Sequence, residues 1–428
     1  MSKMKRICLL SAAACAFVAP MALGQTDNYY SRDKYEAVRD RVQPEFDPEP
    51  VRLGAFRVRA NAELGVTATD NVFASNSNEQ SDVIARAGAN VSATTDWSVH
   101  AVGFDASAVR NEYLDLSTES NNELYGLVRG RLDVTRSFSV GGSVFAEDRT
   151  EPRTLFVNDF GTDAPIEYTR TGARVEANYQ SDRFRWNNSL GSSEFDYEDG
   201  ATIVGGLPVD QDYRDHSLLE GRTRLSYAVS PNFAVFGQGT FSDSEYDTLQ
   251  VIGGLPRSRD SKGYTVSGGV DFELSALVRG DIAVGYLNEE KDDAFYADVS
   301  GLSLDANVQW FPTRLTTVTF GAGRRVVDLG AFDAPSAIET RFNARVDHEL
   351  RRNIILSGYA GVANYEFEEV DRQDDNLELG AVATYKMNKR VHWDAFVRNR
   401  ERDTSGVGVF GDPSFGETVF GIGLRLYP

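Results

Sequence analysis

Charged side chains recur at every second position in many stretches of this chain. Arg129, Arg131 and Asp133 form one such run. Successive side chains of a β-strand point to opposite faces, so residues at period two share one face. Guanidinium and carboxylate groups that line a water-filled space attract or repel charged solutes. We expect such a lining from Arg57, Arg59, Arg129, Arg131, Arg222, Arg224, Arg341, Arg345, Arg398, Arg400, Arg402, Glu63, Asp133, Glu220, Asp271, Asp347 and Asp394. The same residues fit a second interpretation, in which they are wall salt bridges that select nothing.

Residue patterns typical of covalent or metal chemistry are missing from the sequence. The four histidines, His100, His216, His348 and His392, lie in different stretches without the spacing of metal ligands. There is no nucleophile elbow, no phosphate-binding loop with lysine and no zinc-binding helix motif. We therefore predict no catalytic residue, no metal and no cofactor, and we do not expect an enzyme.

The charged rows alternate with apolar rows. Val266 and Val270 belong to an apolar row, whereas Ser267 and Asp271 belong to the polar row between them. The chain offers no helices or second sheet that could cover the apolar face, so we expect that face to meet lipid. Only a closed barrel satisfies the backbone of strands in lipid. The pattern occurs in eighteen stretches and predicts an all-β fold: one transmembrane antiparallel up-and-down β-barrel of 18 strands over residues 54–428.

Short and long connections alternate between these stretches. We expect short periplasmic turns near Thr95-Asp96, Arg136-Ser137, Ser181-Asp182, Ser230-Pro231-Asn232, Ser275-Ala276, Pro312-Thr313, Arg351-Arg352 and Asn388-Lys389. We expect external loops near residues 69–81, 112–121, 150–165, 197–213, 246–261, 290–297, 328–338, 367–375 and 402–415. Trp97, Trp186, Trp310 and Trp393 all lie beside short turns. Because an aromatic ring with a polar edge prefers the membrane boundary, these tryptophans predict a membrane girdle.

The first residues resemble an export signal. Lys3, Lys5 and Arg6 precede an apolar run and a small-x-small site that ends at Gly24, which predicts a signal peptide over residues 1–24. Residues 25–53 are expected to be a periplasmic leader. Both cysteines, Cys8 and Cys15, lie in the segment to be removed, so we expect neither disulfides nor thiol chemistry in the mature chain. The net charge of −20 disfavours a nucleic-acid partner.

Acidic residues gather in several expected loops. Two readings fit them: divalent cations that also bridge lipopolysaccharide phosphates, or a solvated and repulsive mouth. These residues are Glu194, Asp196, Glu198, Asp199, Glu289, Glu290, Asp292, Asp293, Glu366, Glu368, Glu369, Asp371, Asp374 and Asp375.

Two expected loops carry nearly the same hexapeptide, at residues 203–208 and 251–256. The repeat fits a duplicated hairpin, two loops that pack alike over the mouth, or coincidence between Gly-rich loops.

The end of the chain and its entry segment both resemble those of known membrane barrels. Gly421, Leu424 and Leu426 are similar to the terminal signal that the barrel assembly machinery reads, with Tyr427 one place before the end. The entry segment carries Arg39-x-Arg41-x-x-Pro44-Glu45-Phe46-Asp47-Pro48, Arg52-Leu53-Gly54-Ala55-Phe56 and Thr69-Asp70-Asn71-Val72-Phe73. With these residues the chain resembles the putative β-barrel porin type 2 family of Gram-negative bacteria. The resemblance implies an outer-membrane barrel similar to a channel, without catalytic residues, in a family often associated with exopolysaccharide or capsule export.

Three functional hypotheses follow from these observations. The first is a porin-like channel that passes hydrophilic solutes or a polysaccharide chain through the polar lumen. The second, from the resemblance alone, is the outer-membrane component of an exopolysaccharide secretion system, and the third is a closed structural or adhesive barrel. The expected partners are outer-membrane lipid, lipopolysaccharide, the barrel assembly machinery and, under the second hypothesis, polysaccharide export components. The sequence fixes neither the solute nor whether the pore is open or trimeric.

Overall fold

The computed structural model describes residues 36–155, 161–203, 205–274, 277–328, 336–368, 370–406 and 413–428. Long strands dominate it, and two short 3₁₀ helices, η1 (Ser117–Glu119) and η3 (Asp212–Arg214), lie in loops. The strands are β1 (Val51–Leu53), β2 (Phe56–Thr69), β3 (Asp82–Thr95), β4 (Ala101–Tyr113), β5 (Asn121–Asp133), β6 (Phe138–Thr150), β7 (Glu167–Gln180), β8 (Phe184–Tyr197), β9 (Gly200–Ala201), β10 (Pro208–Val209), β11 (His216–Ser230), β12 (Phe233–Tyr246), β13 (Gln250–Ile252), β14 (Leu255–Arg257), β15 (Ser261–Leu274), β16 (Val278–Lys291), β17 (Val299–Thr313), β18 (Thr316–Asp328), β19 (Ser336–Arg351), β20 (Ile354–Phe367), β21 (Arg372–Asn388), β22 (Val391–Gly406) and β23 (Phe415–Leu426).

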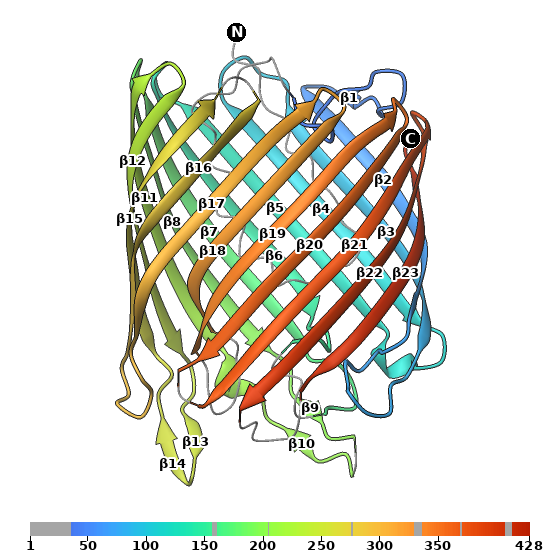
Figure 1. Ribbon diagram of the computed structural model, residues 1–428, viewed down its shortest axis with the longest axis vertical. Helices are drawn as coiled ribbons and strands as arrows, with labels where there is room; N and C mark the ends of the chain where they lie inside the picture. Colours follow the sequence, from blue (N-terminus) through green and yellow to red (C-terminus); the bar gives the residue numbers. More distant parts are fainter. Residues whose placement is uncertain are drawn as a thin grey trace.

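Eighteen long strands form one antiparallel sheet that closes on itself (Figure 1). Each long strand pairs with the next one along the chain, and the first and last, β2 and β23, pair from Ala62↔Leu426 to Thr69↔Val419. Closure removes the unpaired edges that an open sheet would expose. The predicted 18-stranded antiparallel barrel is confirmed.

Alternation along each strand gives the barrel two chemically different walls. On β15, Val266 is 62% exposed on the outer wall, whereas Asp271, of opposite parity, is 2% exposed on the inner wall. The neighbouring strands repeat this pattern in register, because Val266 pairs with Tyr286 and Asp271 pairs with Asp281. The register therefore joins apolar residues into one continuous outer surface and polar residues into another inside. Among the described residues, none belongs to a helix long and apolar enough to cross a membrane.

Short turns lie at one end of the barrel, at the top of Figure 1, and long loops lie at the other. The predicted reversal at Ser275-Ala276 falls outside the described residues, and the other predicted reversals lie at or next to observed turns. Trp97, Trp186, Trp310 and Trp393 are all exposed at the turn end. Their membership of a membrane girdle stays a prediction.

The two loops with similar hexapeptides both contain small hairpins, visible at the bottom of Figure 1. β9 pairs with β10, and β13 pairs with β14. Each hairpin holds two glycines with positive φ, +91° and +59° at Gly205 and Gly206 and +60° and +81° at Gly253 and Gly254. Side chains with a Cβ rarely adopt this conformation, so both loops need glycine there. The two hairpins share the pair of glycines but differ in register, because Pro208 pairs with Ala201 whereas the equivalent Pro256 pairs with Val251.

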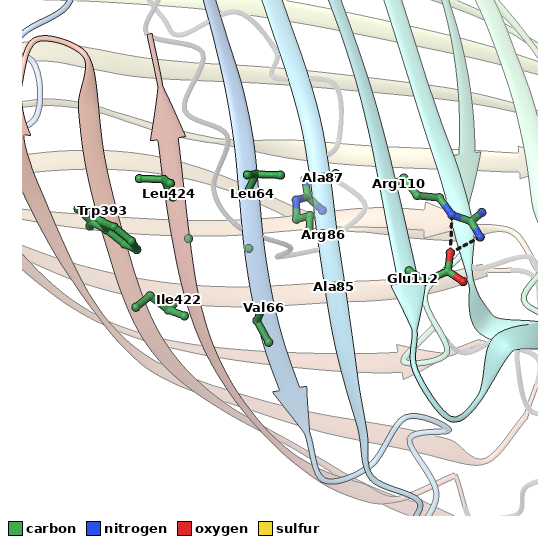
Figure 2. Close-up of a pocket in the computed structure, with 12 residues that line it drawn as sticks. Leu64, Val66, Ala85, Arg86, Ala87, Arg110, Glu112, Trp393, Ile422 and Leu424 are labelled. Carbon is green, nitrogen blue, oxygen red and sulfur yellow. Dashed lines mark hydrogen bonds and ion pairs between the residues drawn. The ribbon is translucent and has the colours of Figure 1, made fainter.

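A groove crosses the outer wall over β22, β23, β2 and β3 (Figure 2). Its volume is about 440 Å³. Gly65, Ala85 and Ala87 contribute little side-chain bulk to it, whereas Trp393 is one of its large apolar residues. Toward the loop end, Arg110 and Glu112 of β4 form an exposed ion pair with a shortest separation of 2.5 Å. The groove is thus apolar over β22, β23 and β2 and charged at its side on β4.

Candidate functional site

Contacts between strands that are not neighbours identify the inner wall. Arg400 on β22 donates a hydrogen bond of 3.2 Å to Thr154, in the loop after β6. Arg402 donates to the backbone carbonyl of the same residue, and its guanidinium lies 5.1 Å from the ring centroid of Phe415. Only side chains inside the barrel can reach across in this way. The parity of Arg400 and Arg402 therefore marks the inner wall on β22.

The buried predicted residues form ion pairs along this wall. Arg224 on β11 lies 3.0 Å from Asp271 on β15 and 3.6 Å from Asp281 on β16. Its guanidinium also lies 3.5 Å from the ring centroid of Phe236. The Arg224 side chain is 8% exposed and that of Asp271 is 3% exposed, so each charge depends on the other in a poorly hydrated place.

Most other predicted residues pair with close neighbours on the same wall. Arg345 contacts Asp347 at 3.0 Å on its own strand, and Arg131 contacts Asp133 at 3.0 Å in the same way. Further pairs on this wall are Arg57 with Asp96, Arg129 with Asp105 at 2.6 Å, Arg222 with Gln238 at 2.6 Å, Arg341 with Glu339 at 3.7 Å, Arg398 with Glu417 at 3.7 Å, Arg400 with Glu417 at 2.7 Å, and Asp394 with Arg425. Arg59 and Glu63 lie on the inner parity of β2 and are also engaged in interactions. The structure brings these residues together as a chain of local ion pairs, and they do not gather at one level.

Glu220 lies in a different setting, an inner recess of about 160 Å³. Arg174, Arg222 and Arg325 line this recess together with Glu220 and Glu289, and apart from Leu287 its other inner-wall residues are small or hydroxylated. The recess therefore offers both signs of charge beside hydroxyl groups on the inner wall.

Sequence reasoning did not identify the loop arginines that form ion pairs at the loop end of the barrel, called the external mouth below. Arg153 contacts Glu119 at 2.6 Å and donates to Thr162 at 2.9 Å, with the Phe73 ring centroid 5.6 Å away. These residues come from three different loops. A charged residue in a loop resembles any solvated side chain, so no sequence signal distinguished Arg153.

A second missed pair joins the loop of Arg153 to a further loop. Arg214 in η3 lies 2.5 Å from Glu151, and its guanidinium stacks 3.9 Å from the ring centroid of Tyr197. Burial lowers the pKa of Arg214, but the nearby carboxylate of Glu151 outweighs burial, so the pKa lies above its usual value. Arg259, before β15, similarly reaches Asp328 at the end of β18, 3.0 Å away. Buried ion pairs thus tie several external loops together over the mouth.

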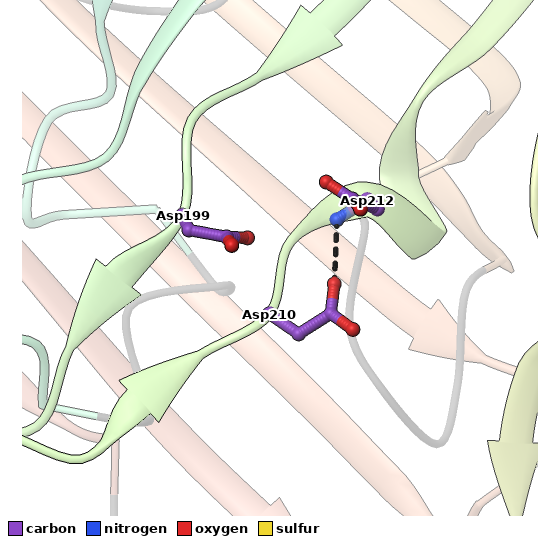
Figure 3. A group of neighbouring side chains, drawn as sticks. All are labelled: Asp199, Asp210 and Asp212. Atoms are coloured by element: carbon purple, nitrogen blue, oxygen red, sulfur yellow. Dashed lines mark hydrogen bonds between the residues drawn. The ribbon is translucent and has the colours of Figure 1, made fainter.

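Three aspartates of one external loop lie close together (Figure 3). Asp199, Asp210 and Asp212 each place one carboxylate oxygen within 4.8 Å of the others, and all three are exposed. Asp199 accepts the backbone N–H of Gln211 at 2.8 Å, and Asp210 accepts that of Asp212 at 2.9 Å. Repulsion by Asp199 and then Asp210 raises the pKa of Asp212. The cluster fits both readings of the acidic loops, so cation binding by the loops stays a prediction.

Each of the four histidines has its own protein surroundings. His216 stacks between Phe195 and Tyr246, at centroid distances of 4.4 and 4.9 Å. His100 accepts the backbone N–H of Asp133 at 3.0 Å. His348 lies 3.0 Å from the hydroxyl of Thr316, and His392 lies 3.0 Å from the carbonyl oxygen of Phe46. These contacts account for the histidines as structural residues.

Comparisons with known proteins complete this description. A family profile described as "Putative beta-barrel porin 2" matches residues 43–427. A search among curated protein sequences gives no match. Among solved structures, the chain is similar to a copper transporter, OprC, with 11% identity over 89% of this chain and 81% of that chain and a TM-score of 0.48. It is also similar to a BenF-like porin from Pseudomonas fluorescens Pf-5, with 10% identity over 87% and 99% and a TM-score of 0.46. A third similar structure is OccK2 (OpdF) of Pseudomonas aeruginosa in complex with glucuronate, with 10% identity over 88% and 99% and a TM-score of 0.47.

Proposed function

Because the chain belongs to the putative beta-barrel porin 2 family, we propose that it is an outer-membrane channel for the passive diffusion of hydrophilic solutes. In this proposal residues 1–24 are removed on export, and the barrel crosses the membrane many times with both ends of the mature chain on the periplasmic side. Transport of this kind needs a polar lumen of sufficient width and no covalent chemistry.

The observation that carries the proposal is the contrast between the two walls. Large apolar side chains are exposed on the outer wall, such as Val266 at 62% and Phe420 at 58%. The inner wall carries ion pairs along its length, from Asp133 beside a turn to Arg400 near the loops. Charged side chains at this density must be hydrated or paired with an opposite charge. A water-filled interior inside an apolar shell is the arrangement that a diffusion channel requires.

Arg222 is the inner-wall arginine best suited to test selectivity. It donates a hydrogen bond of 2.6 Å to the neutral amide of Gln238. Replacing Arg222 therefore removes a lumen charge without leaving a hydrogen-bonded carboxylate behind, unlike replacement of Arg129, which would leave Asp105 buried. A cation on the wall favours anions in the pore, since it raises their local concentration.

The experiment measures reversal potentials of the purified protein in planar bilayers under a salt gradient. Arg222→Glu should shift the selectivity toward cations. Arg110→Gln is the matched control, because Arg110 lies on the outer wall and its charge should leave the reversal potential unchanged. Absence of ion conductance in the wild-type protein would contradict the channel and favour a closed structural or adhesive barrel.

A further inference from the structure

The segment before the first barrel strand lies inside the barrel at the turn end. Val38 is only 1% exposed, and its backbone N–H donates a hydrogen bond of 3.0 Å to the hydroxyl of Thr317 on β18. Thr317 itself is 2% exposed and has inner-wall parity. A residue preceding a barrel strand becomes this buried only when the wall and its own segment enclose it. Residues 36–49, called the N-terminal segment below, therefore occupy interior space.

Two ion pairs attach the N-terminal segment to inner-wall strands beyond β18. Arg41 lies 2.5 Å from Glu349 on β19 and also donates to the backbone carbonyl of Arg314 in the adjoining turn. Asp47 lies 2.6 Å from Lys386 on β21. Glu349 is 7% exposed, so Arg41 shields this carboxylate from water.

Further contacts extend the attachment around the wall. The carbonyl oxygen of Phe46 lies 3.0 Å from Nε2 of His392 on β22. Arg39 interacts electrostatically with Asp347 on β19 and Asp394 on β22, and Asp40 interacts with Arg279 on β16. The N-terminal segment thus spans the interior between β16 and β22 rather than following one strand.

The chain then leaves the interior through a fixed exit. β1 pairs with the turn end of β2, with Leu53 opposite Phe56, and Gly54 between them adopts φ +59°. Pro48 and Pro50 stiffen the approach to β1. This exit holds one end of the N-terminal segment at the rim, while its other contacts are side-chain pairs and single hydrogen bonds. None of these contacts is part of the strand pairing of the barrel, so they can be released without unfolding a barrel strand.

We propose that the N-terminal segment is an internal plug that narrows the turn-end mouth and that its release widens the pore. The widening of the pore rests on the channel function proposed above, whereas the position of the N-terminal segment inside the barrel does not. The segment binds inner-wall residues of its own barrel through both signs of charge: Arg41 pairs with the carboxylate of Glu349, and Asp47 pairs with the ammonium group of Lys386. An unrelated leader would have no reason to match the wall in this way.

Thiol labelling tests the position of the plug independently of conduction. Cys8 and Cys15 are the only cysteines of the chain, and both lie in the expected signal peptide. A single introduced cysteine is therefore the only thiol of the mature chain that the reagent can modify. In Thr317→Cys, deletion of residues 36–49 should speed modification by a small water-soluble reagent by at least about tenfold, because thiol reactivity follows exposure. The control is Ser226→Cys on β11, which is equally buried at 2% and lies outside the strands β16 to β22 that the N-terminal segment contacts, and its rate should not change. Equal rates for Thr317→Cys with and without residues 36–49 would overturn the plug.

Conductance of the same two chains tests the widening. The deleted chain should show a larger single-channel conductance than the full chain. An unchanged conductance in conducting chains would overturn the widening. If neither chain conducts, the proposed channel fails and the widening with it, while the labelling rates still decide whether the plug exists.

Discussion

The guanidinium of Arg224 on β11 lies 3.0 Å from the carboxylate of Asp271 on β15, two strands away along the inner wall. The contact passes over β12, where Phe236 places its ring centroid 3.5 Å from the guanidinium. Asp271 is directly opposite Asp281 in the register, so Arg224 also separates two like charges. One arginine therefore supports the register of several neighbouring strands.

Removing this guanidinium should destabilise the barrel strongly. Arg224→Met removes the guanidinium that the buried carboxylates of Asp271 and Asp281 share, which should lower the free energy of unfolding by about 3 kcal/mol. Unfolding in urea from detergent micelles measures the loss. Arg131→Gln is the matched control, because the side chains of Arg131 and Asp133 are 46% and 26% exposed and such pairs contribute less than about 1 kcal/mol. Equal losses in both variants would contradict the role of burial.

A glycine under an aromatic ring gives a second prediction. Gly380 on β21 is opposite Tyr359 on β20, and a Cβ at position 380 would lie 2.2 Å from Cζ of that ring. Gly380→Ala should therefore cost about 1–3 kcal/mol through overpacking. Gly358→Ala, on the same strand as the ring, should be nearly neutral because nothing lies within 4 Å of its Cβ. Adding Tyr359→Leu to Gly380→Ala should recover part of the loss, and no recovery would show that the ring is not the cause.

The loop before β11 predicts a dependence of stability on pH. Burial raises the pKa of Asp215 from 3.8 to about 6. The hydrogen bond that the backbone N–H of Tyr197 donates to this carboxylate acts in the opposite direction, because it favours the charged form, but it is the smaller effect. Because the folded state binds this proton more tightly, the stabilisation is fully present below pH 3.8 and is lost as the pH rises through about 6. Asn mimics the neutral acid, so Asp215→Asn should be more stable than the wild type at pH 8, and the gap should close toward pH 4. Urea midpoints across this range measure the gap, and a gap independent of pH would exclude the carboxyl group as its source.

The alternation of apolar and polar residues along each strand predicted most of the fold. Such alternation arises because one face of the barrel wall meets lipid and the other meets water. Alternation at period two was enough to assign Val266 and Ser267 to opposite faces of one strand. The positions of the short turns then gave the number of strands. The register remained open, since pairing such as Asp271 with Asp281 depends on the twist and tilt of the complete barrel. Sequence alone could name the charged inner rows but could not pair Arg224 with Asp271.

Contacts between distant parts of the chain were beyond sequence reasoning for a different reason. Arg41 pairs with Glu349 across 308 residues, and Arg400 reaches Thr154 across 246. Neither pair has a periodic pattern, because loops and the N-terminal segment follow no repeated geometry. The interior arrangement of these segments appears only once the barrel brings its strands together.

The wet interior behind an apolar outer wall is the central claim, and adjacent residues of β15 test it most directly. Nitroxide labels at positions 266 and 267, placed one at a time in the purified protein in lipid vesicles, report accessibility to oxygen and to a water-soluble nickel complex. The label at Val266 should be accessible to oxygen dissolved in lipid, and the label at Ser267 should be accessible to the nickel complex. A label at position 267 that the nickel complex cannot reach, or one at position 266 that it reaches freely, would contradict a water-filled channel inside a lipid-facing wall.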